Sequence, residues 1–274
     1  MDYTGKTAWI TGASSGIGAA LARDFASRGG HVILSGRDEA RLANVAADCG
    51  EALILPFDVR DEAALADATA TALGWKGQID LAVANAGVSQ RSRALKTGMA
   101  VYREIIEIDL IAQIAFSQGL IGPMAQRGSG ALVFISSIAG KVGVPMRTAY
   151  SAAKFGLAGY ADALRGELSI NGASVHTIYP GSVATNVSRN ALNADGSVRG
   201  VSDKAIDNGI PAGGAAKTML DGIAKGEREI IIAERAELAM GEMRRTPDEL
   251  FDQIEAMVAS GYMENMEAET ESQK

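Results

Sequence analysis

The stretch TGASSGIGAALARDF, residues 11–25, decides how the rest of the chain is interpreted. It follows a short apolar run at 6–11 and brings three glycines close together. Gly12 can adopt the positive φ of a sharp turn, Gly16 leaves room for a phosphate, and Gly18 lets the next helix pack closely. The pattern predicts a strand, a phosphate-binding turn and a helix N-terminus. Glycines that serve packing alone are the alternative.

The helix that follows this turn would present unpaired N–H groups and the positive end of its dipole to a pyrophosphate. The sequence therefore predicts that the whole turn contacts a dinucleotide. The residues assigned to this contact are Gly12, Ser14, Ser15, Gly16, Ile17 and Gly18.

Short apolar runs alternate with helical patterns over most of the chain. The strand candidates are nearly continuous apolar runs, which is typical of a parallel sheet with helices on both faces. They lie at 6–11, 31–35, 52–57, 80–85, 131–136, 174–179 and 229–233. The helical patterns lie at about 16–28, 38–48, 61–73, 99–126, 148–169 and 211–225. The sequence predicts one doubly wound α/β domain.

Two segments interrupt this alternation. Residues 182–208 are long and polar, and we expect a lid over the site, with a disordered loop as the alternative. Residues 263–274 are acidic and polar and predict a solvated, disordered tail after a single domain at 1–262. Before the tail, apolar spacing over 247–260 predicts an amphipathic helix with Pro247 at its first position.

The composition excludes several classes of function. A net charge of −7 over 274 residues argues against a nucleic-acid partner. The single cysteine, Cys49, excludes an internal disulfide framework and fits a reducing cytoplasm. No secretory signal is visible, and no run approaches the roughly 20 apolar residues of a membrane span. We expect a cytoplasmic protein with no membrane partner.

The second predicted strand ends in LSGRDEARL, residues 34–42. At this position of dinucleotide folds an acidic residue binds the ribose 2′-OH, whereas an arginine accommodates a 2′-phosphate. Arg37 therefore favours NADP(H) as cofactor, with NAD(H) less favoured. Asp38 is assigned to the N-cap of the next helix, because DEAR gives that helix an acidic first turn.

Two further strand ends contribute to the predicted cofactor site. Asp58, with Val59 beside it, ends the third strand and either contacts the adenine or caps the next helix. The fourth strand ends in Asn85, Ala86 and Gly87, where small residues would let the backbone lie against the adenosine half.

Three polar side chains form the predicted reaction centre. Ser137 follows the fifth strand, at the sheet edge where doubly wound folds bind ligands. Tyr150 and Lys154 are four residues apart, so a helix places the phenol and the ammonium side by side. The ammonium favours the phenolate that an acid/base tyrosine needs, and the serine can hold a substrate oxygen. Taken one at a time, these residues have alternative interpretations: Tyr150 and Lys154 as a pair on a helix surface, and Ser137 as a helix cap.

At these residues the sequence resembles the short-chain dehydrogenase/reductase family, over about residues 5–235. The resemblance rests on ordered motifs at Thr11–Gly18, Asn85–Gly87, Ser137, Tyr150–Lys154 and Pro180–Thr185. It implies a single-domain Rossmann fold, with a doubly wound parallel seven-stranded sheet and helices on both faces. It also implies NAD(P)-dependent interconversion of an alcohol and a carbonyl.

The resemblance further implies a role for each matching residue. Tyr150 is the acid/base, Ser137 orients the substrate, and Lys154 favours the ionised phenol and binds the nicotinamide ribose. Asn85 flanks the adenosine ribose. The nicotinamide carboxamide and the diphosphate are held by Pro180, Gly181, Val183 and Thr185.

One residue departs from the family pattern. In EIIEIDLIAQIAF, residues 104–116, Asp109 stands where the family has an asparagine. The family residue offers its backbone carbonyl to a water in a proton relay that reaches the lysine, and an aspartate keeps that carbonyl. A carboxylate near Lys154 would alter the local charge. We assign Asp109 to the catalytic site, with helix packing as the alternative.

Partners and alternative functions follow from the same features. The helices at 148–164 and 99–126 are apolar on several sides, which predicts a homodimer or homotetramer. Arg91, Arg93 and Lys96 either attract an anionic substrate or form a solvated basic face. We expect a small-molecule alcohol or carbonyl substrate and no metal. A catalytically silent dinucleotide-binding sensor or scaffold is the alternative, and an isomerase, epimerase or dehydratase is a further one.

Overall fold

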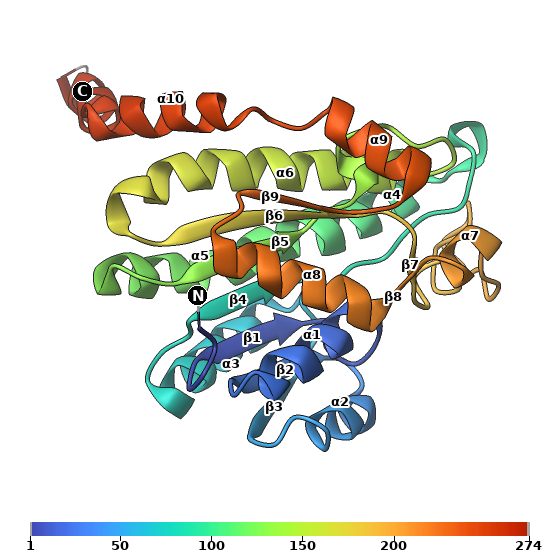
Figure 1. The fold of residues 1–274 in the computed structure, drawn as a ribbon. Coiled ribbons are helices and arrows are strands. Elements are labelled where there is room, and N and C mark those ends of the chain that lie inside the picture. Colours follow the sequence, from blue (N-terminus) through green and yellow to red (C-terminus); the bar gives the residue numbers. More distant parts are fainter. Residues whose placement is uncertain (1, 273–274) are drawn as a thin grey trace.

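The fold is built around one parallel sheet with helices on both faces (Figure 1). The structure is a computed structural model, and it describes residues 2–272. The sheet has seven parallel strands, as predicted, and their order is β3-β2-β1-β4-β5-β6-β9. Their bounds are β1 Thr7–Thr11, β2 His31–Gly36, β3 Ala52–Pro56, β4 Leu81–Ala84, β5 Ala131–Ile135, β6 Ser174–Pro180 and β9 Glu229–Ile232. The strand order reverses between β1 and β4, where such sheets bind ligands beyond the carboxyl ends of their strands.

The two layers of helices bury opposite faces of the strands. Successive strand residues point to opposite faces, so Ile10 packs into one hydrophobic core and Trp9 into the other. The first core contains α1 Gly16–Ser27, α2 Glu39–Ala46 and α8 Ala212–Lys225. The second contains α3 Glu62–Lys76, α5 Ala112–Arg127 and α6 Thr148–Leu168. Short 3₁₀ turns lie at η1 Ala94–Lys96, η3 Ile138–Gly140 and η4 Ser169–Asn171.

The long helix predicted at 99–126 contains a local widening. It consists of α4 Met99–Ile106, a π-helical turn at Glu107–Ile111 and α5. Such turns are frequent at functional sites, and this one carries Asp109. Among the described residues, Met99–Arg127 is long and apolar enough to cross a membrane by length and composition. The expectation that no run reaches that length was therefore wrong, although in this fold Phe116 is buried against the sheet.

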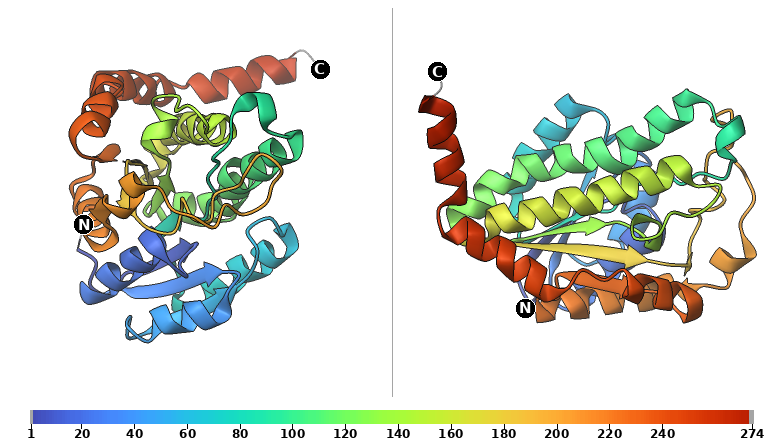
Figure 2. Two further views of the ribbon diagram at one scale, coloured as in Figure 1. Left: turned by 90° about the vertical axis from the view of Figure 1, so that its right-hand side faces the viewer. Right: turned by 90° about the horizontal axis from the view of Figure 1, so that it is seen from above.

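The segment predicted as a lid contains short elements at the carboxyl end of the sheet (Figure 2). Strand β7 Val183–Ala184 pairs in parallel with β8 Ile210–Pro211, and α7 spans Lys204–Asp207. Asp203 forms ion pairs with Arg91 at 2.6 Å and with Arg199 at 2.5 Å. Burial alone would raise the pKa of Asp203, but the bonds from Arg199 and Arg91 outweigh it and lower the pKa to about 2. Arg91 therefore anchors this segment and is not part of a solvated basic face.

The C-terminal segment forms three helices beside the sheet. They are α9 Arg235–Met243, α10 Asp248–Ala259 and α11 Tyr262–Ser272. Helix α10 lies along α6 (Figure 1). Phe251 of α10 is buried there, with the centre of its ring 4.3 Å from Cζ of Arg165. Pro247 occupies the N-cap of α10, one residue before the predicted position. The described part of the tail predicted as disordered is helical in α11, because its methionine, glutamate and alanine residues favour helix. This helix turns away from the rest of the molecule (Figure 2). Residues 273–274 of the predicted tail lie outside the described residues.

Candidate active site

A cleft of about 1010 Å³ opens at the carboxyl edge of the sheet. All of the predicted site residues line it except Gly18. Gly18 is buried behind the turn, where an added Cβ would lie 2.5 Å from the carbonyl oxygen of Gly12 and 2.6 Å from Nδ2 of Asn85. The structure thus assigns Gly18 to the close packing of α1 on β1, and the other predicted residues to the cleft wall.

The glycine turn forms an open cradle at the N-terminus of α1. Gly12 has a φ of +63°, and a Cβ there would lie 2.9 Å from Cα of Ala86. Gly16 has a φ of +56°, and a Cβ there would lie 3.1 Å from Cγ2 of Thr185. Ser15 is the N-cap of α1, and its side chain makes no capping hydrogen bond. The Ser15 hydroxyl and the first N–H groups of α1 are therefore left for a ligand, as in helix-terminal anion sites.

The opposite wall of the cradle is held by side chains from three elements. Nδ2 of Asn85 donates to the carbonyl oxygen of Thr11 at 2.9 Å. Oγ1 of Thr11 accepts from the N–H groups of Asn85 and Ala86 at 3.0 and 3.1 Å. From α5, Nε2 of Gln113 donates to the carbonyl oxygen of Ala86 at 2.8 Å. Sequence reasoning missed the role of Gln113, because no local pattern links it to a strand end 27 residues away.

At the end of β2 the guanidinium of Arg37 makes no ion pair with another described residue, although its charge adds to the hydrogen bonds from Arg60 in lowering the pKa of Asp58. Asp38 accepts from the N–H of Arg41 at 3.0 Å, which confirms it as the N-cap of α2. Its carboxylate also pairs with the Arg41 side chain at 3.0 Å. Arg37 is exposed at the cleft rim and has no hydrogen bond or ion pair within residues 2–272. The residue predicted to bind a 2′-phosphate is thus unpaired.

Asp58 lies in the cleft wall, and it does not cap α3. Hydrogen bonds from Arg60, through its side chain at 2.6 Å and its N–H at 3.1 Å, lower the pKa of Asp58. The N-cap of α3 is Asp61, which accepts from the N–H of Ala64 at 3.0 Å. The capping alternative for Asp58 was therefore wrong.

The serines after β5 join the sheet to α6 and to the loop after β6. Oγ of Ser136 donates to the carbonyl oxygen of Lys154 at 2.9 Å, which fixes α6 against the end of β5. Ser137 is the N-cap of η3, and its Oγ accepts from the N–H of Ala139 at 3.1 Å. The same hydroxyl donates to the carbonyl oxygen of Pro180 across 3.3 Å. This long bond leaves the Ser137 proton available to a better acceptor.

Helix α6 places Tyr150 and Lys154 one turn apart in the cleft. Nζ of Lys154 lies 5.6 Å from the centre of the Tyr150 ring. The ammonium donates to the carbonyl oxygen of Ile135 at 2.9 Å, and its side chain is 4% exposed. The end of β5 therefore holds the lysine beside the tyrosine.

Asp109 reaches this centre from the π-helical turn. Its Oδ1 accepts from the N–H of Val88 at 2.7 Å, and its Oδ2 lies 3.4 Å from Nζ of Lys154. Oδ2 is buried and accepts no hydrogen bond within the described part of the chain. Burial raises the pKa of Asp109, and the charge of Lys154 and the Val88 bond oppose that shift. The structure thus places the predicted carboxylate beside Lys154.

The four predicted catalytic side chains therefore come together in one cleft with the glycine turn. Within residues 2–272, no group of three or more histidine, cysteine, aspartate or glutamate side chains is arranged to hold a metal ion.

Comparison with known proteins gives one family. A family model described as short chain dehydrogenase matches residues 6–195. Dehydrogenase/reductase SDR family member 7B of Danio rerio is 36% identical over 238 residues, which cover 83% of this chain and 77% of the relative. Dehydrogenase/reductase SDR family protein 7-like of Drosophila melanogaster is 33% identical over 238 residues, which cover 84% of this chain and 73% of the relative.

Two solved structures share the fold. A short-chain dehydrogenase from Sphingobium yanoikuyae in complex with NADPH has a TM-score of 0.72 and 26% identity, covering 82% of this chain and 87% of that one. A short chain dehydrogenase/reductase from Burkholderia phymatum in complex with NAD has a TM-score of 0.79 and 22% identity, covering 90% of this chain and 98% of that one. At this identity the likeness supports the fold alone. On the family model and these relatives, the chain belongs to the short-chain dehydrogenase/reductase family of NAD(P)-binding oxidoreductases.

Proposed function

We propose that the protein is an NADP(H)-preferring oxidoreductase that interconverts an alcohol and a carbonyl of a small molecule, with Tyr150 as acid/base. One observation carries the proposal. Ser137, Tyr150 and Lys154 line the same cleft as the open N-terminus of α1. A dinucleotide held by that terminus can therefore extend toward the tyrosine.

The residues of the cleft fit a nicotinamide dinucleotide. The glycines at 12 and 16 let the turn lie against Ala86 and Thr185 with positive φ, and the N–H groups of α1 suit a diphosphate. The loop Pro180–Thr185 would hold the nicotinamide half, and Asn85 with Ala86 would border the adenosine half. The free guanidinium of Arg37 suits a 2′-phosphate, which is the basis for preferring NADP(H). When bound, the cofactor supplies or accepts the hydride.

The side chains of the chain manage the oxygen and its proton. In the reductive direction Ser137 donates a hydrogen bond to the substrate carbonyl oxygen, and the Tyr150 phenol gives its proton to that oxygen. In the oxidative direction the phenolate of Tyr150 takes the hydroxyl proton back. The ammonium of Lys154 favours the phenolate by its charge, and the carbonyl oxygen of Ile135 keeps it in place.

We also propose that two or four copies assemble through the helices beside the site. Ile111 and Phe155 are exposed apolar side chains, at 42% and 38%, on the long helical segment and on α6. A second copy would cover them. Analytical ultracentrifugation at micromolar concentration should show a dimer or tetramer, and a monomer would contradict the assembly.

Carbonyl reduction can be tested by following NADPH oxidation against ketones and β-ketoacyl thioesters. Short hydroxy acids with NADP⁺ test the reverse direction. We expect turnover with members of at least one class. Tyr150→Phe should lower it by about 10²–10⁴-fold while the Kd for NADPH stays unchanged. Tight NADPH binding with no turnover over the whole panel would favour the silent sensor.

The cofactor preference rests on Arg37. Titration of the wild type should give a lower Kd for NADPH than for NADH. Arg37→Ala should raise the Kd for NADPH by about tenfold and leave the Kd for NADH unchanged, since the arginine would contact the 2′-phosphate alone. Equal affinities in the wild type would contradict the preference.

A further inference from the structure

Helix α9 lies outside residues 6–195, the part of the chain that the family model matches, and it packs against the active site. It follows the edge strand β9 and contacts η3, the turn that begins after Ser137. Gly241 permits this approach, because a Cβ there would lie 2.9 Å from Cδ1 of Ile138 and 3.1 Å from Cγ2 of Ile231. A C-terminal helix is therefore held close to a predicted catalytic serine.

Glu237 on α9 binds the loop that would hold the nicotinamide. Its Oε2 accepts from the backbone N–H of Ser182 at 2.7 Å, and its Oε1 accepts from Oγ of the same serine at 2.9 Å. The carboxylate lies so close that a Cβ at residue 181 would overlap with Oε2, so a side chain there would displace Glu237 from this contact. Both carboxylate oxygens of a half-buried side chain are thus used on one residue of the loop.

Backbone hydrogen bonds also hold the Gly181–Ser182 peptide unit of this loop in place. The N–H of Gly181 donates to the carbonyl oxygen of Ile232 at 2.9 Å. The carbonyl oxygen of Ser182 accepts from the N–H of Ile210 at 2.9 Å. Gly181 and Val183, on either side of Ser182, line the cleft. The two hydrogen bonds that Glu237 accepts from Ser182 therefore help to orient the backbone between the cleft residues Gly181 and Val183.

Two features of α9 indicate that this contact is built into the fold. Arg235, its first residue, has a φ of +52°, a strained conformation for a residue with a side chain. The strained turn lies two residues before Glu237, where the chain leaves β9. At the other end of α9, the carbonyl oxygen of Arg244 accepts from Nζ of Lys141 at 2.9 Å, and Lys141 also pairs with buried Glu229.

We propose that Glu237 is a positioning residue for the nicotinamide half of the cofactor. It holds the Gly181–Ser182 peptide so that the N–H of Val183 and the rest of the loop face the cleft. It acts through Ser182 and touches neither substrate nor the reacting atoms. The proposal rests on the proposed function, because it assumes a nicotinamide dinucleotide in the cleft.

Isothermal titration calorimetry with two probes tests the proposal. The probes are NADPH and 2′-phospho-ADP-ribose, which lacks the nicotinamide. Glu237→Ala should raise the Kd for NADPH by about tenfold, since two bonds to a charged acceptor are lost, and change the Kd for 2′-phospho-ADP-ribose by less than about twofold. Glu237→Gln keeps the volume and one acceptor and should raise the Kd for NADPH by about threefold. It keeps the test valid if the alanine variant does not fold.

The matched control is Glu242→Gln on the same helix. Glu242 is exposed and pairs only with Arg245, at 2.9 Å, among the described residues, so this variant should bind both probes like the wild type. Adding Ser182→Ala to Glu237→Ala should not raise the Kd for NADPH any further, because the two residues act through one contact.

The outcomes separate the two proposals. Unchanged NADPH affinity in both Glu237 variants, or equal weakening of both probes, overturns the positioning role alone. Failure of the wild type to bind NADPH overturns the proposed function and the positioning role with it.

Discussion

Two lysine–carboxylate pairs are buried in this fold to the same degree, yet their surroundings differ. The side chains of Lys141 and Glu229 are 4% and 2% exposed, and those of Lys154 and Asp109 are 4% and 0% exposed. Lys141 donates to both oxygens of Glu229, at 2.9 and 2.8 Å. Lys154 lies 3.4 Å from one oxygen of Asp109, and that oxygen accepts no hydrogen bond from any described residue.

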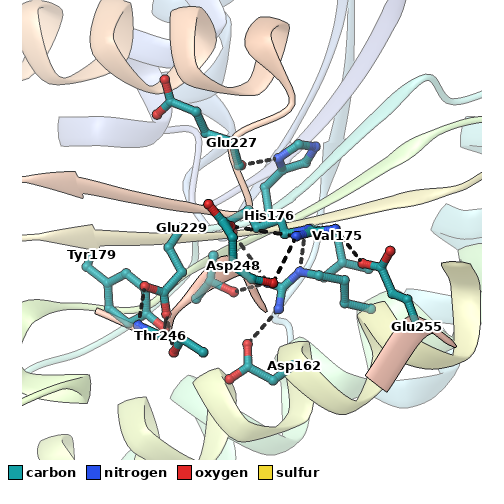
Figure 3. A network of polar contacts seen from close by, with 12 residues as sticks. Asp162, Val175, His176, Tyr179, Glu227, Glu229, Thr246, Asp248 and Glu255 are labelled. Atoms are coloured by element: carbon teal, nitrogen blue, oxygen red, sulfur yellow. Dashed lines mark hydrogen bonds and ion pairs between the residues drawn. The ribbon is translucent and has the colours of Figure 1, made fainter. Parts of the chain in front are cut away.

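The neighbours of each pair explain what it can do. Around Glu229, Oγ1 and the N–H of Thr246 donate at 2.9 and 3.2 Å, and the Tyr179 hydroxyl donates across 3.4 Å (Figure 3). Burial raises the pKa of Tyr179, so it stays a donor. The first pair is thus satisfied on all sides and connects β9, η3 and the chain after α9. The second pair lines an open cleft and keeps unused bonding capacity, which suits charge changes during a reaction.

The largest expected effect is on turnover, at the second pair. Lys154→Met removes the ammonium beside Tyr150 and should lower kcat by about 10²–10⁴-fold. The free energy of unfolding should fall by only about 1–2 kcal/mol, because Asp109, whose pKa is already raised by burial, can take up a proton. Stopped-flow turnover and urea denaturation of the same preparation measure both quantities. A Lys154→Met variant that loses much of its unfolding free energy but keeps its kcat would contradict the chemical role of this pair.

The next effect is on stability, at the first pair. Glu229→Gln leaves the Lys141 ammonium buried without a counter-charge and should lower the free energy of unfolding by about 3–5 kcal/mol. For a chain of this size that corresponds to a fall in Tm of roughly 10 °C. The folded fraction should keep its kcat at saturating cofactor, whereas the KM for NADPH should rise because α9 is anchored less firmly. Calorimetry checks the first expectation, and a stability within about 1 kcal/mol of wild type would refute it.

The smallest effect is a pH dependence at Asp109. A carboxyl whose pKa is raised in the folded state binds its proton more readily there, so its contribution to stability is lost as pH rises through that pKa. Asparagine does not titrate. Relative to the wild type, Asp109→Asn should therefore become more stable as the pH rises from about 4 to 8.

Urea denaturation at several pH values measures this difference. Glu229→Asp is the matched control, because it keeps a carboxyl in the other pair. A difference between wild type and Asp109→Asn that does not change with pH would show that Asp109 carries no raised pKa.

Local patterns in the sequence were enough to predict the α/β fold, the glycine turn and the Tyr150–Lys154 pair, whereas the Pro180–Thr185 loop and Asp109 were predicted from the family resemblance. Continuous apolar runs predicted the seven strands, because a strand covered on both faces has no polar side. The glycine turn was visible because the positive φ at Gly12 and Gly16 requires residues without a Cβ. The i, i+4 spacing put Tyr150 and Lys154 on one face of α6, as the structure shows.

Contacts between distant segments could not be predicted in the same way. Lys141 and Glu229 are 88 residues apart, and Ser182 and Glu237 are 55 apart, so no periodicity links them. Each glutamate alone looks like any surface charge. The acidic composition of residues 263–274 predicts disorder, whereas the methionine, glutamate and alanine residues of α11 favour helix. The π-helical turn at Asp109 was not predicted, since the side chain of Gln113, which donates to the carbonyl oxygens of Ile108 in that turn and Ala86 after β4, makes contacts that no local pattern indicates.

The most direct test makes the same substitution in both pairs. Lys141→Met and Lys154→Met should be compared by unfolding free energy and by kcat at saturating NADPH in one set of preparations. We expect a crossed result, in which Lys141→Met loses about 3–5 kcal/mol of stability with kcat retained, and Lys154→Met loses kcat with most of its stability retained. Parallel losses in both variants would contradict the division of the two pairs into a structural one and a chemical one.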